Sequence, residues 1–142
     1  MKQRMQSTIS IVLVLLLALS LASCGNRVDP TGLWEDATYL KDTELGKGSK
    51  TLVVEVAVAE QTVTLTIHTD EETVGAALLK EGVIEGEEGQ YGLYVKKVNG
   101  ITADYDVDQS YWGFYIDGEY AMTGVDGTSI EEGRIYRLAY EQ

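Results

Sequence analysis

Residues 51–68, TLVVEVAVAEQTVTLTIH, decide the fold that we expect for this chain. Apolar, mostly β-branched side chains stand at every second position in both halves of the stretch: Leu52, Val54, Val56, Val58, Val63, Leu65 and Ile67. A period of two is typical of strands that bury one face. Glu60 and Gln61 lie between the halves and suit a tight turn, so the stretch predicts a β-hairpin.

The period changes after the hairpin. Thr73 is placed to cap a short helix, which Gly82 is placed to end. Val74, Ala77 and Leu78 share one face of that helix. A helix this short is stable only when it packs against other elements, so we expect this face to lie on a sheet.

Further strands are predicted C-terminal to the helix, at residues 91–98, 111–116, 119–122 and 134–140. The dipeptides Asn99-Gly100 and Asp117-Gly118 indicate tight turns, and residues 85–90 are expected to form a glycine-rich acidic loop. Two strands, one short crossing helix and then more strands is the order of an α+β, β-grasp-like sheet.

The N-terminus has the pattern of an export signal. Lys2 and Arg4 precede a nearly unbroken apolar run over residues 9–22, which is short for the roughly 20 apolar residues of a membrane span. Residues 21–24, LASC, resemble the lipobox of bacterial lipoproteins. The resemblance implies that the Cys24 thiol carries a diacylglyceryl group and that the chain is cut before it. A plain cleaved signal and an uncleaved anchor are the alternatives.

The export signal divides the chain into three predicted parts. Residues 1–23 are the lipoprotein signal peptide, residues 24–50 the lipidated cysteine with a tether or N-terminal extension, and residues 51–142 the β-grasp domain. Two acyl chains hold a protein firmly on a membrane. We therefore expect an exported protein, anchored through Cys24 on the extracytoplasmic face of a bacterial membrane. The sequence leaves open whether the host has one membrane or two, and whether residues 33–50 join the domain.

The charge of the chain excludes one class of partner. The full sequence has a formal net charge of −12, and loss of residues 1–23 would leave 9 basic against 23 acidic residues, or −14. So acidic a protein repels nucleic acid. Cys24 is the only cysteine, so the sequence excludes an intramolecular disulfide.

Four stretches carry a resemblance to a known family: residues 73–78 (TVGAAL), 91–94 (YGLY), 111–120 (YWGFYIDGEY) and 124–126 (GVD). They resemble the bacterial domains grouped with the C-terminal domain of transcobalamin and intrinsic factor, in the soluble-ligand-binding β-grasp class. The resemblance implies a small soluble ligand. In the vitamin B12 carriers the Tyr-Trp strand lines the cobalamin site, which points to Tyr111 and Trp112. Gly113 stands where the carriers usually have glutamine, and their large helical barrel is not predicted here, so a corrinoid is a candidate ligand only.

Aromatic side chains concentrate on the strand predicted at residues 111–116. Trp112 and Phe114 would face the core, while Tyr111, Gly113 and Tyr115 would face the other way. A Tyr-Gly-Tyr platform admits a flat ligand closely, although ordinary cross-strand tyrosine pairing gives the same pattern. The candidate ligand contacts are therefore Tyr111, Trp112, Gly113 and Tyr115, with Tyr91 and Tyr94 from the preceding strand.

The triplet Asp104, Asp106 and Asp108 is the strongest metal pattern, and it is weak. An EF-hand loop starting there would need glycine at position 109 and glutamate at 115, where the chain has Gln109 and Tyr115. A solvated acidic loop is the favoured interpretation, and no metal is predicted. The single histidine of the chain has neither a second histidine nor a free cysteine beside it for zinc.

The sequence offers no pattern of an enzyme. A histidine-based triad would rest on His68 alone, and no nucleophile motif accompanies it. We therefore expect a surface-anchored, non-enzymatic lipoprotein that binds a small soluble ligand and holds no resident cofactor. The alternative is a protein-interaction or envelope adhesion module, because an exposed aromatic strand can also dock another protein.

Overall fold

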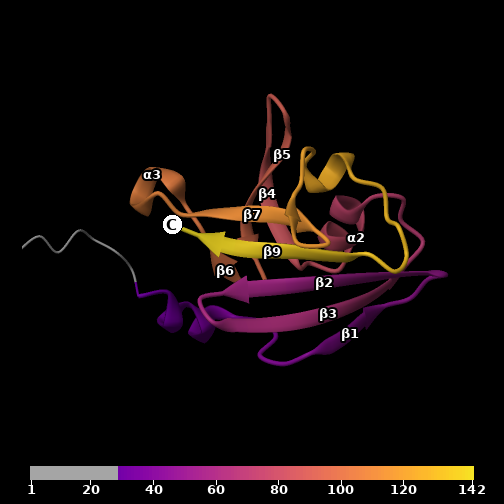
Figure 1. The fold of residues 1–142 in the computed structure, drawn as a ribbon, viewed down its shortest axis with the longest axis horizontal. Helices are drawn as coiled ribbons and strands as arrows, with labels where there is room; N and C mark the ends of the chain where they lie inside the picture. Colours follow the sequence, from indigo (N-terminus) through magenta and orange to yellow (C-terminus); the bar gives the residue numbers. More distant parts are fainter. Residues whose placement is uncertain (1–28) are drawn as a thin grey trace, which may run out of the picture.

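Residues 29–142 are described by the computed structural model, as two sheets with short helices (Figure 1). The elements in chain order are η2 (Pro30–Asp36), β1 (Thr43–Gly46), β2 (Lys50–Val58), β3 (Gln61–Thr69), α2 (Val74–Lys80), β4 (Ile84–Gly89), β5 (Gly92–Val98), β6 (Ile101–Thr102), α3 (Tyr105–Asp108), β7 (Tyr111–Ile116), β8 (Glu119–Tyr120), η3 (Val125–Gly127) and β9 (Ile135–Glu141).

The larger sheet has the strand order β1-β3-β2-β9-β7-β8. The hairpin β2–β3 is antiparallel, β9 runs parallel to β2, and β7 is antiparallel to β9. The first long strand and the last strand thus lie side by side at the centre, as Figure 1 shows. This is the α+β, β-grasp-like fold that the sequence predicts. The smaller sheet has the order β4-β5-β6.

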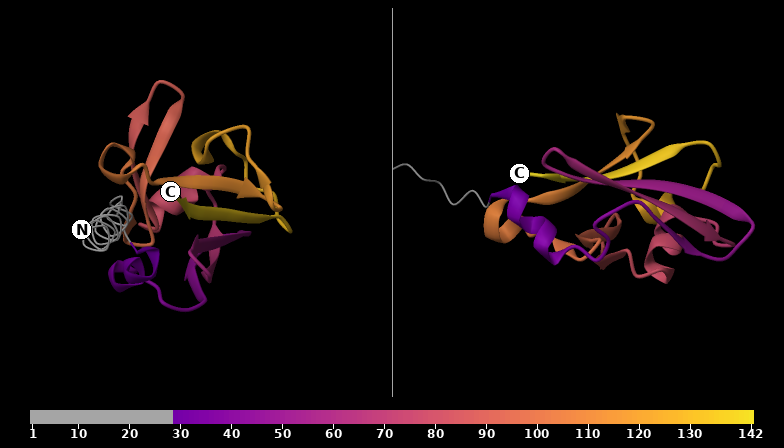
Figure 2. Two further views of the ribbon diagram at one scale, coloured as in Figure 1. Left: turned by 60° about the vertical axis from the view of Figure 1, so that its left-hand side comes forward. Right: turned by 90° about the horizontal axis from the view of Figure 1, so that it is seen from below.

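The alternating apolar side chains of the β2–β3 hairpin form much of the core of the fold. Every apolar position quoted from β2 and β3 is at most 2% exposed, and Val74, Ala77 and Leu78 of α2 are fully buried in the same cluster. Thr73 caps α2, because its hydroxyl accepts a hydrogen bond from the backbone N–H of Ala76 at 3.2 Å. Burial of each of the Val, Leu and Ile side chains contributes about 1.5–3 kcal/mol, which holds the helix against the sheet (Figure 2).

The prediction of a loop at residues 85–90 is wrong, because most of these residues belong to strand β4. β4 pairs with β5 in a hairpin that projects from the body of the molecule (Figure 1). After Ile84 the side chains of β4 are all exposed, so the strand has no apolar period. It is held by backbone pairing and by cross-strand ion pairs, Glu87 with Lys96 at 3.2 Å and Glu85 with Lys97 at 3.4 Å.

Residues 30–50 pack against the rest of the fold. The indole Nε1 of Trp34 donates to the carbonyl of Val58 at 3.2 Å, and β1 pairs in parallel with β3. The buried side chain of Asn99 bonds both the N–H and the carbonyl of Tyr39, at 2.8 and 2.9 Å. The sequence leaves open whether residues 33–50 join the domain, and in the structure they contact it through these hydrogen bonds and strand pairs.

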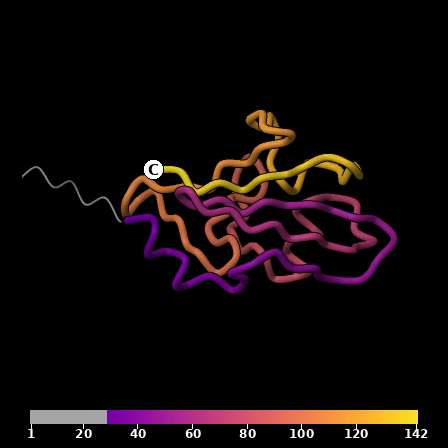
Figure 3. Tube along the Cα trace, turned by 60° about the horizontal axis from the view of Figure 1, so that its bottom comes forward, coloured from indigo at the N-terminus to yellow at the C-terminus, as the bar shows by residue number. Residues whose placement is uncertain are grey.

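The predicted signal peptide and Cys24 lie outside residues 29–142. Within those residues the structure has no helix that is long and apolar enough to cross a membrane. Residue 29 and the C-terminus emerge at the same end of the fold, as the trace in Figure 3 and the ribbon in Figure 1 both show.

Candidate functional site

A hollow of about 360 Å³ opens between β5, β7 and the loop that follows β8. Its lining is uncharged and largely aromatic or aliphatic, and we call it the aromatic hollow: Leu93, Tyr94, Val95, Tyr111, Trp112, Phe114, Tyr120, Ala121, Met122, Thr123, Gly124, Val125 and Leu138. The volume lies in the lower part of the range of roughly 300–1,000 Å³ of small-molecule sites. A lining of this kind favours a molecule with an apolar, flat face.

Trp112 and Phe114 line the hollow and are fixed by packing from below. Both side chains are 8% exposed. The ring of Trp112 meets Tyr140 edge to face at 5.7 Å between centroids, and Phe114 stacks on Tyr136 at 6.2 Å. These contacts hold the two rings in place.

The indole N–H of Trp112 is the one buried side-chain donor or acceptor of residues 29–142 that has no hydrogen-bond partner. An unmet buried polar group costs about 1–3 kcal/mol. The donor thus lies unused in a residue that lines the hollow.

The rim of the hollow exposes large apolar side chains. Tyr94 is 44% exposed, Tyr111 36%, Tyr120 63% and Met122 98%. Tyrosine combines an apolar face with a polar tip, and methionine adapts to ligands of varied shape. Exposed apolar side chains that gather in this way are a common feature of interaction surfaces.

One hydrogen bond between distant parts of the chain joins two of the segments that border the hollow. The carboxylate of Asp126, in η3, accepts a hydrogen bond from the backbone N–H of Leu93 at 3.1 Å. Gly92 makes room for that carboxylate, because a Cβ at this position would lie 2.6 Å from Asp126 Oδ2. The loop after β8 is thereby tied to β5.

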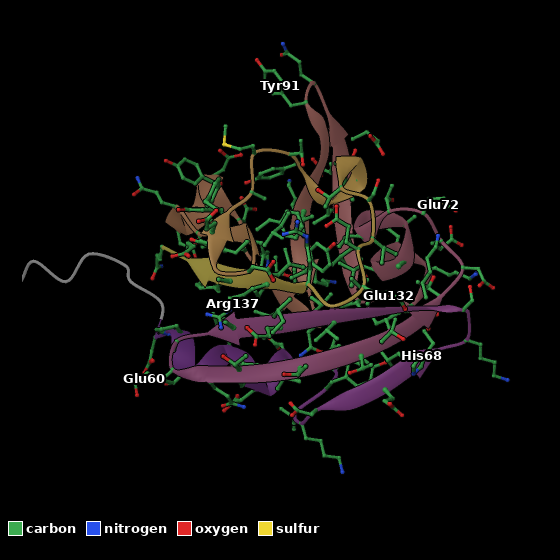
Figure 4. The ribbon with its side chains drawn as sticks, turned by 45° about the vertical axis from the view of Figure 1, so that its right-hand side comes forward. Glu60, His68, Glu72, Tyr91, Glu132 and Arg137 are labelled. Atoms are coloured by element: carbon green, nitrogen blue, oxygen red, sulfur yellow. The ribbon has the colours of Figure 1, made fainter. Side chains whose placement is uncertain are left out.

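The structure brings together three of the residues that the sequence singles out, and separates the other three. Tyr94, Tyr111 and Trp112 line the aromatic hollow, while Gly113, Tyr115 and Tyr91 do not. Tyr91 is 93% exposed and stands at the tip of the β4–β5 hairpin (Figure 4).

The expected Tyr-Gly-Tyr platform is not an open surface. The Tyr115 hydroxyl donates to Glu141 Oε1 at 2.9 Å, and a Cβ at Gly113 would meet Tyr115 Cε2 at 3.0 Å and Glu141 Cγ at 3.3 Å. Hydrogen bonding to Glu141, aided by desolvation, raises the pKa of the Tyr115 hydroxyl. The protein's own side chains therefore cover the glycine, and the open aromatic surface lies on the Trp112 side.

The acidic stretch at residues 104–108 is a short helix, α3, and not the loop expected from the sequence. The Asp104 carboxylate caps it by accepting from the N–H of Asp106 at 3.0 Å. Asp108 accepts hydrogen bonds from the hydroxyl and N–H of Ser110, which lower the pKa of its carboxyl. In residues 29–142 no group of three or more His, Cys, Asp or Glu side chains is arranged to hold a metal ion.

A family model of a domain of unknown function, DUF4430, matches residues 71–141, which is half of the chain. The chain belongs to this family. The match includes every residue that lines the aromatic hollow. No curated protein matches the chain at a significant level.

Two solved structures share the fold of this DUF4430 chain. A protein of Ruminococcus gnavus ATCC 29149, named as a candidate metal-binding protein, is 29% identical with a TM-score of 0.62, and the match covers 66% of this chain and 98% of that one. Haptocorrin in complex with Cbi is 17% identical with a TM-score of 0.50. That match covers 66% of this chain but 25% of haptocorrin, so it supports the fold and not the ligand.

Proposed function

We propose that this DUF4430 protein is exported, is anchored by a lipid on Cys24, and binds a small soluble molecule in the aromatic hollow. The observation that carries the proposal is the hollow itself, which has an uncharged, largely aromatic lining and whose bordering segments are joined by the Asp126–Leu93 hydrogen bond. Preorganisation of this kind lowers the entropic cost of binding. The site is proposed as a non-catalytic one, since its lining contains neither a carboxylate nor an imidazole.

The chemistry of the lining limits the ligand. Tyr94, Tyr111 and Trp112 offer aromatic faces and edges to a flat apolar group. The strongly negative chain disfavours an anion. A corrinoid is the first candidate because the fold is shared with haptocorrin, which is described in complex with Cbi. A metal ion is not supported as the ligand of this hollow, although the Ruminococcus gnavus relative is named for metal binding.

Docking of a protein is the second candidate function. It is favoured by two side chains that are almost fully exposed, Met122 at 98% and Tyr91 at 93%. Apolar groups so far from the core gain their burial only when something else covers them. The projecting β4–β5 hairpin would then form one edge of the interface (Figure 4).

A ligand screen separates the two candidates. The purified protein is heated with cyanocobalamin, haem and other envelope metabolites, and each shift in melting temperature is followed by calorimetry. A ligand present at 100 times its dissociation constant adds about 2.7 kcal/mol of stability. Tyr94→Ala and Tyr111→Ala should each weaken a genuine hit, whereas Tyr115→Phe, outside the hollow, should not. A flat response to the whole panel contradicts the small-molecule proposal and favours the docking of a protein.

A further inference from the structure

A second hollow, of about 460 Å³, lies on the other side of the segment Tyr120–Thr123. We call it the polar hollow, and its lining is Ile116, Glu119, Tyr120, Ala121, Met122, Thr123, Gly127, Thr128, Ser129, Glu131, Arg134 and Tyr136. All four residues from Tyr120 to Thr123 also line the aromatic hollow. A single stretch of chain is thus the wall that the two hollows share.

The shared wall carries an exposed methionine. Met122 borders both hollows and is 98% exposed. The wall is fixed on both sides of it, because the N–H of Ala121 donates to the carbonyl of Phe114 at 2.9 Å and the hydroxyls of Thr123 and Thr128 lie 3.0 Å apart. A flexible, polarizable side chain between two open hollows can pack against a molecule that crosses from one to the other.

The side chain of Thr123 offers a hydrogen-bond acceptor to the polar hollow. The Thr128 hydroxyl donates to the carbonyl of Gly124 at 2.8 Å, so the hydrogen between the two threonines comes from Thr123. The Thr123 oxygen therefore keeps its lone pairs for a ligand.

The charges of the polar hollow favour the same kind of ligand. Arg134 is held by Glu131 and by Asp117, the latter at 3.0 Å, so its positive charge is already paired. Glu119 is exposed and adds a second carboxylate to the lining. The polar hollow thus suits N–H and O–H donors and disfavours anions.

We infer that the two hollows form one bipartite site for an amphipathic molecule. Its flat apolar part lies in the aromatic hollow, and an arm bearing N–H or O–H donors crosses Met122 into the polar hollow. The arm is neutral or cationic, since a carboxylate or phosphate would meet the exposed carboxylate of Glu119, whereas Glu131 is already paired with Arg134. The inference rests on the proposed function, because it presumes that the aromatic hollow binds a small molecule.

Three matched probes test the inference on the purified full chain. N-methyl-2-naphthamide supplies the ring alone, N-(3-aminopropyl)-2-naphthamide adds a cationic donor arm, and N-(3-carboxypropyl)-2-naphthamide adds an anionic arm of similar length. Calorimetry or Trp fluorescence gives the dissociation constants. We expect the amino probe to bind roughly threefold to fivefold more tightly than the methyl probe, as for a partly exposed charged contact, and the carboxylate probe to bind most weakly.

Two variants locate the arm. Met122→Ser should weaken the amino probe roughly threefold or more through lost apolar contact, whereas Leu40→Ser, at another exposed apolar side chain, should change nothing. Glu119→Gln, at a carboxylate that lines the polar hollow and not the aromatic hollow, should weaken the amino probe much more than the methyl probe.

The outcomes separate the two proposals. The bipartite site would be overturned if the three probes bound with equal affinity, or if Met122→Ser bound the amino probe as tightly as the unmodified protein does. Either result would leave the aromatic hollow as a binding site. If none of the probes binds, and the screen of envelope metabolites is also flat, the proposed small-molecule function fails and the bipartite site fails with it.

Discussion

The side chain of Asp126 accepts a hydrogen bond from the backbone N–H of Leu93, 33 residues away, at 3.1 Å. This contact joins η3 to β5 across the aromatic hollow, and Gly92 leaves the space for it. The carboxylate of Asp126 is therefore one of the groups that hold the loop after β8, together with the hydrogen bond from the N–H of Ala121 to the carbonyl of Phe114.

Replacement of Asp126 should loosen the hollow more than it destabilises the fold. Asp126→Ala removes one exposed hydrogen bond, so we expect a loss of roughly 0.5–1.5 kcal/mol in the free energy of unfolding. Any ligand of the hollow should bind more weakly, because the loop must be ordered on binding. Asp126→Asn is the matched control, since it keeps an acceptor oxygen. Calorimetry gives the ligand affinity and urea unfolding gives the free energy of unfolding. Unchanged ligand affinity in Asp126→Ala would show that the Asp126–Leu93 contact does not contribute to binding in the hollow.

Trp34 tests whether residues 30–50 are integral to the domain. Its side chain is 7% exposed and donates to the carbonyl of Val58. Trp34→Ala should lower the free energy of unfolding by about 3–5 kcal/mol, as for other buried large aromatic side chains. Leu40→Ala is the control, because Leu40 is 64% exposed and should change stability by less than about 0.5 kcal/mol. If Trp34→Ala and the unmodified protein unfolded at the same denaturant concentration, residues 30–50 would not stabilise the domain and would act only as a tether.

Asp108 should make stability depend on pH in the acid range. Hydrogen bonds from Ser110 lower the pKa of its carboxyl in the folded state. A depressed pKa contributes stability that is present above the unfolded value of about 3.9 and is lost as the pH falls through the folded value. Asp108→Asn should therefore be less stable than the unmodified protein at pH 6, with a gap that narrows below about pH 4. Urea unfolding at pH 6 and pH 3 measures this, and a gap that widened in acid would have the wrong sign.

Cys24 should be the site of lipid attachment. Because a thiol is required for the thioether to a diacylglyceryl group, Cys24→Ser should abolish incorporation of labelled fatty acid and release the protein from the membrane fraction. Asn26→Ser, two residues further on, should leave both unchanged. Labelling that persists in Cys24→Ser would contradict the lipobox interpretation.

The sequence by itself determined the strands whose apolar side chains alternate, and the helix that packs on them. Period-two patterns and the Asp117-Gly118 turn are local signals, and both residues of that turn adopt positive φ, at 49° and 85°. Strand β4 was not predicted from the sequence, because its side chains after Ile84 are exposed and so do not alternate between apolar and polar. The long-range contacts of Trp34 and Asn99 could not be predicted either, because the hydrogen-bond partner of each side chain is far away in the chain.

The candidate site, too, was predictable from the sequence only in part. Tyr94, Tyr111 and Trp112 could be named from the aromatic strands, because residue type and strand phase are readable in sequence. The covering of Gly113 by Tyr115 and Glu141, and the placing of Met122 between two hollows, arise only when β9 and the loop after β8 meet β7 and β5. Tertiary structure decided these features, since they depend on contacts between segments whose separation in sequence carries no local preference.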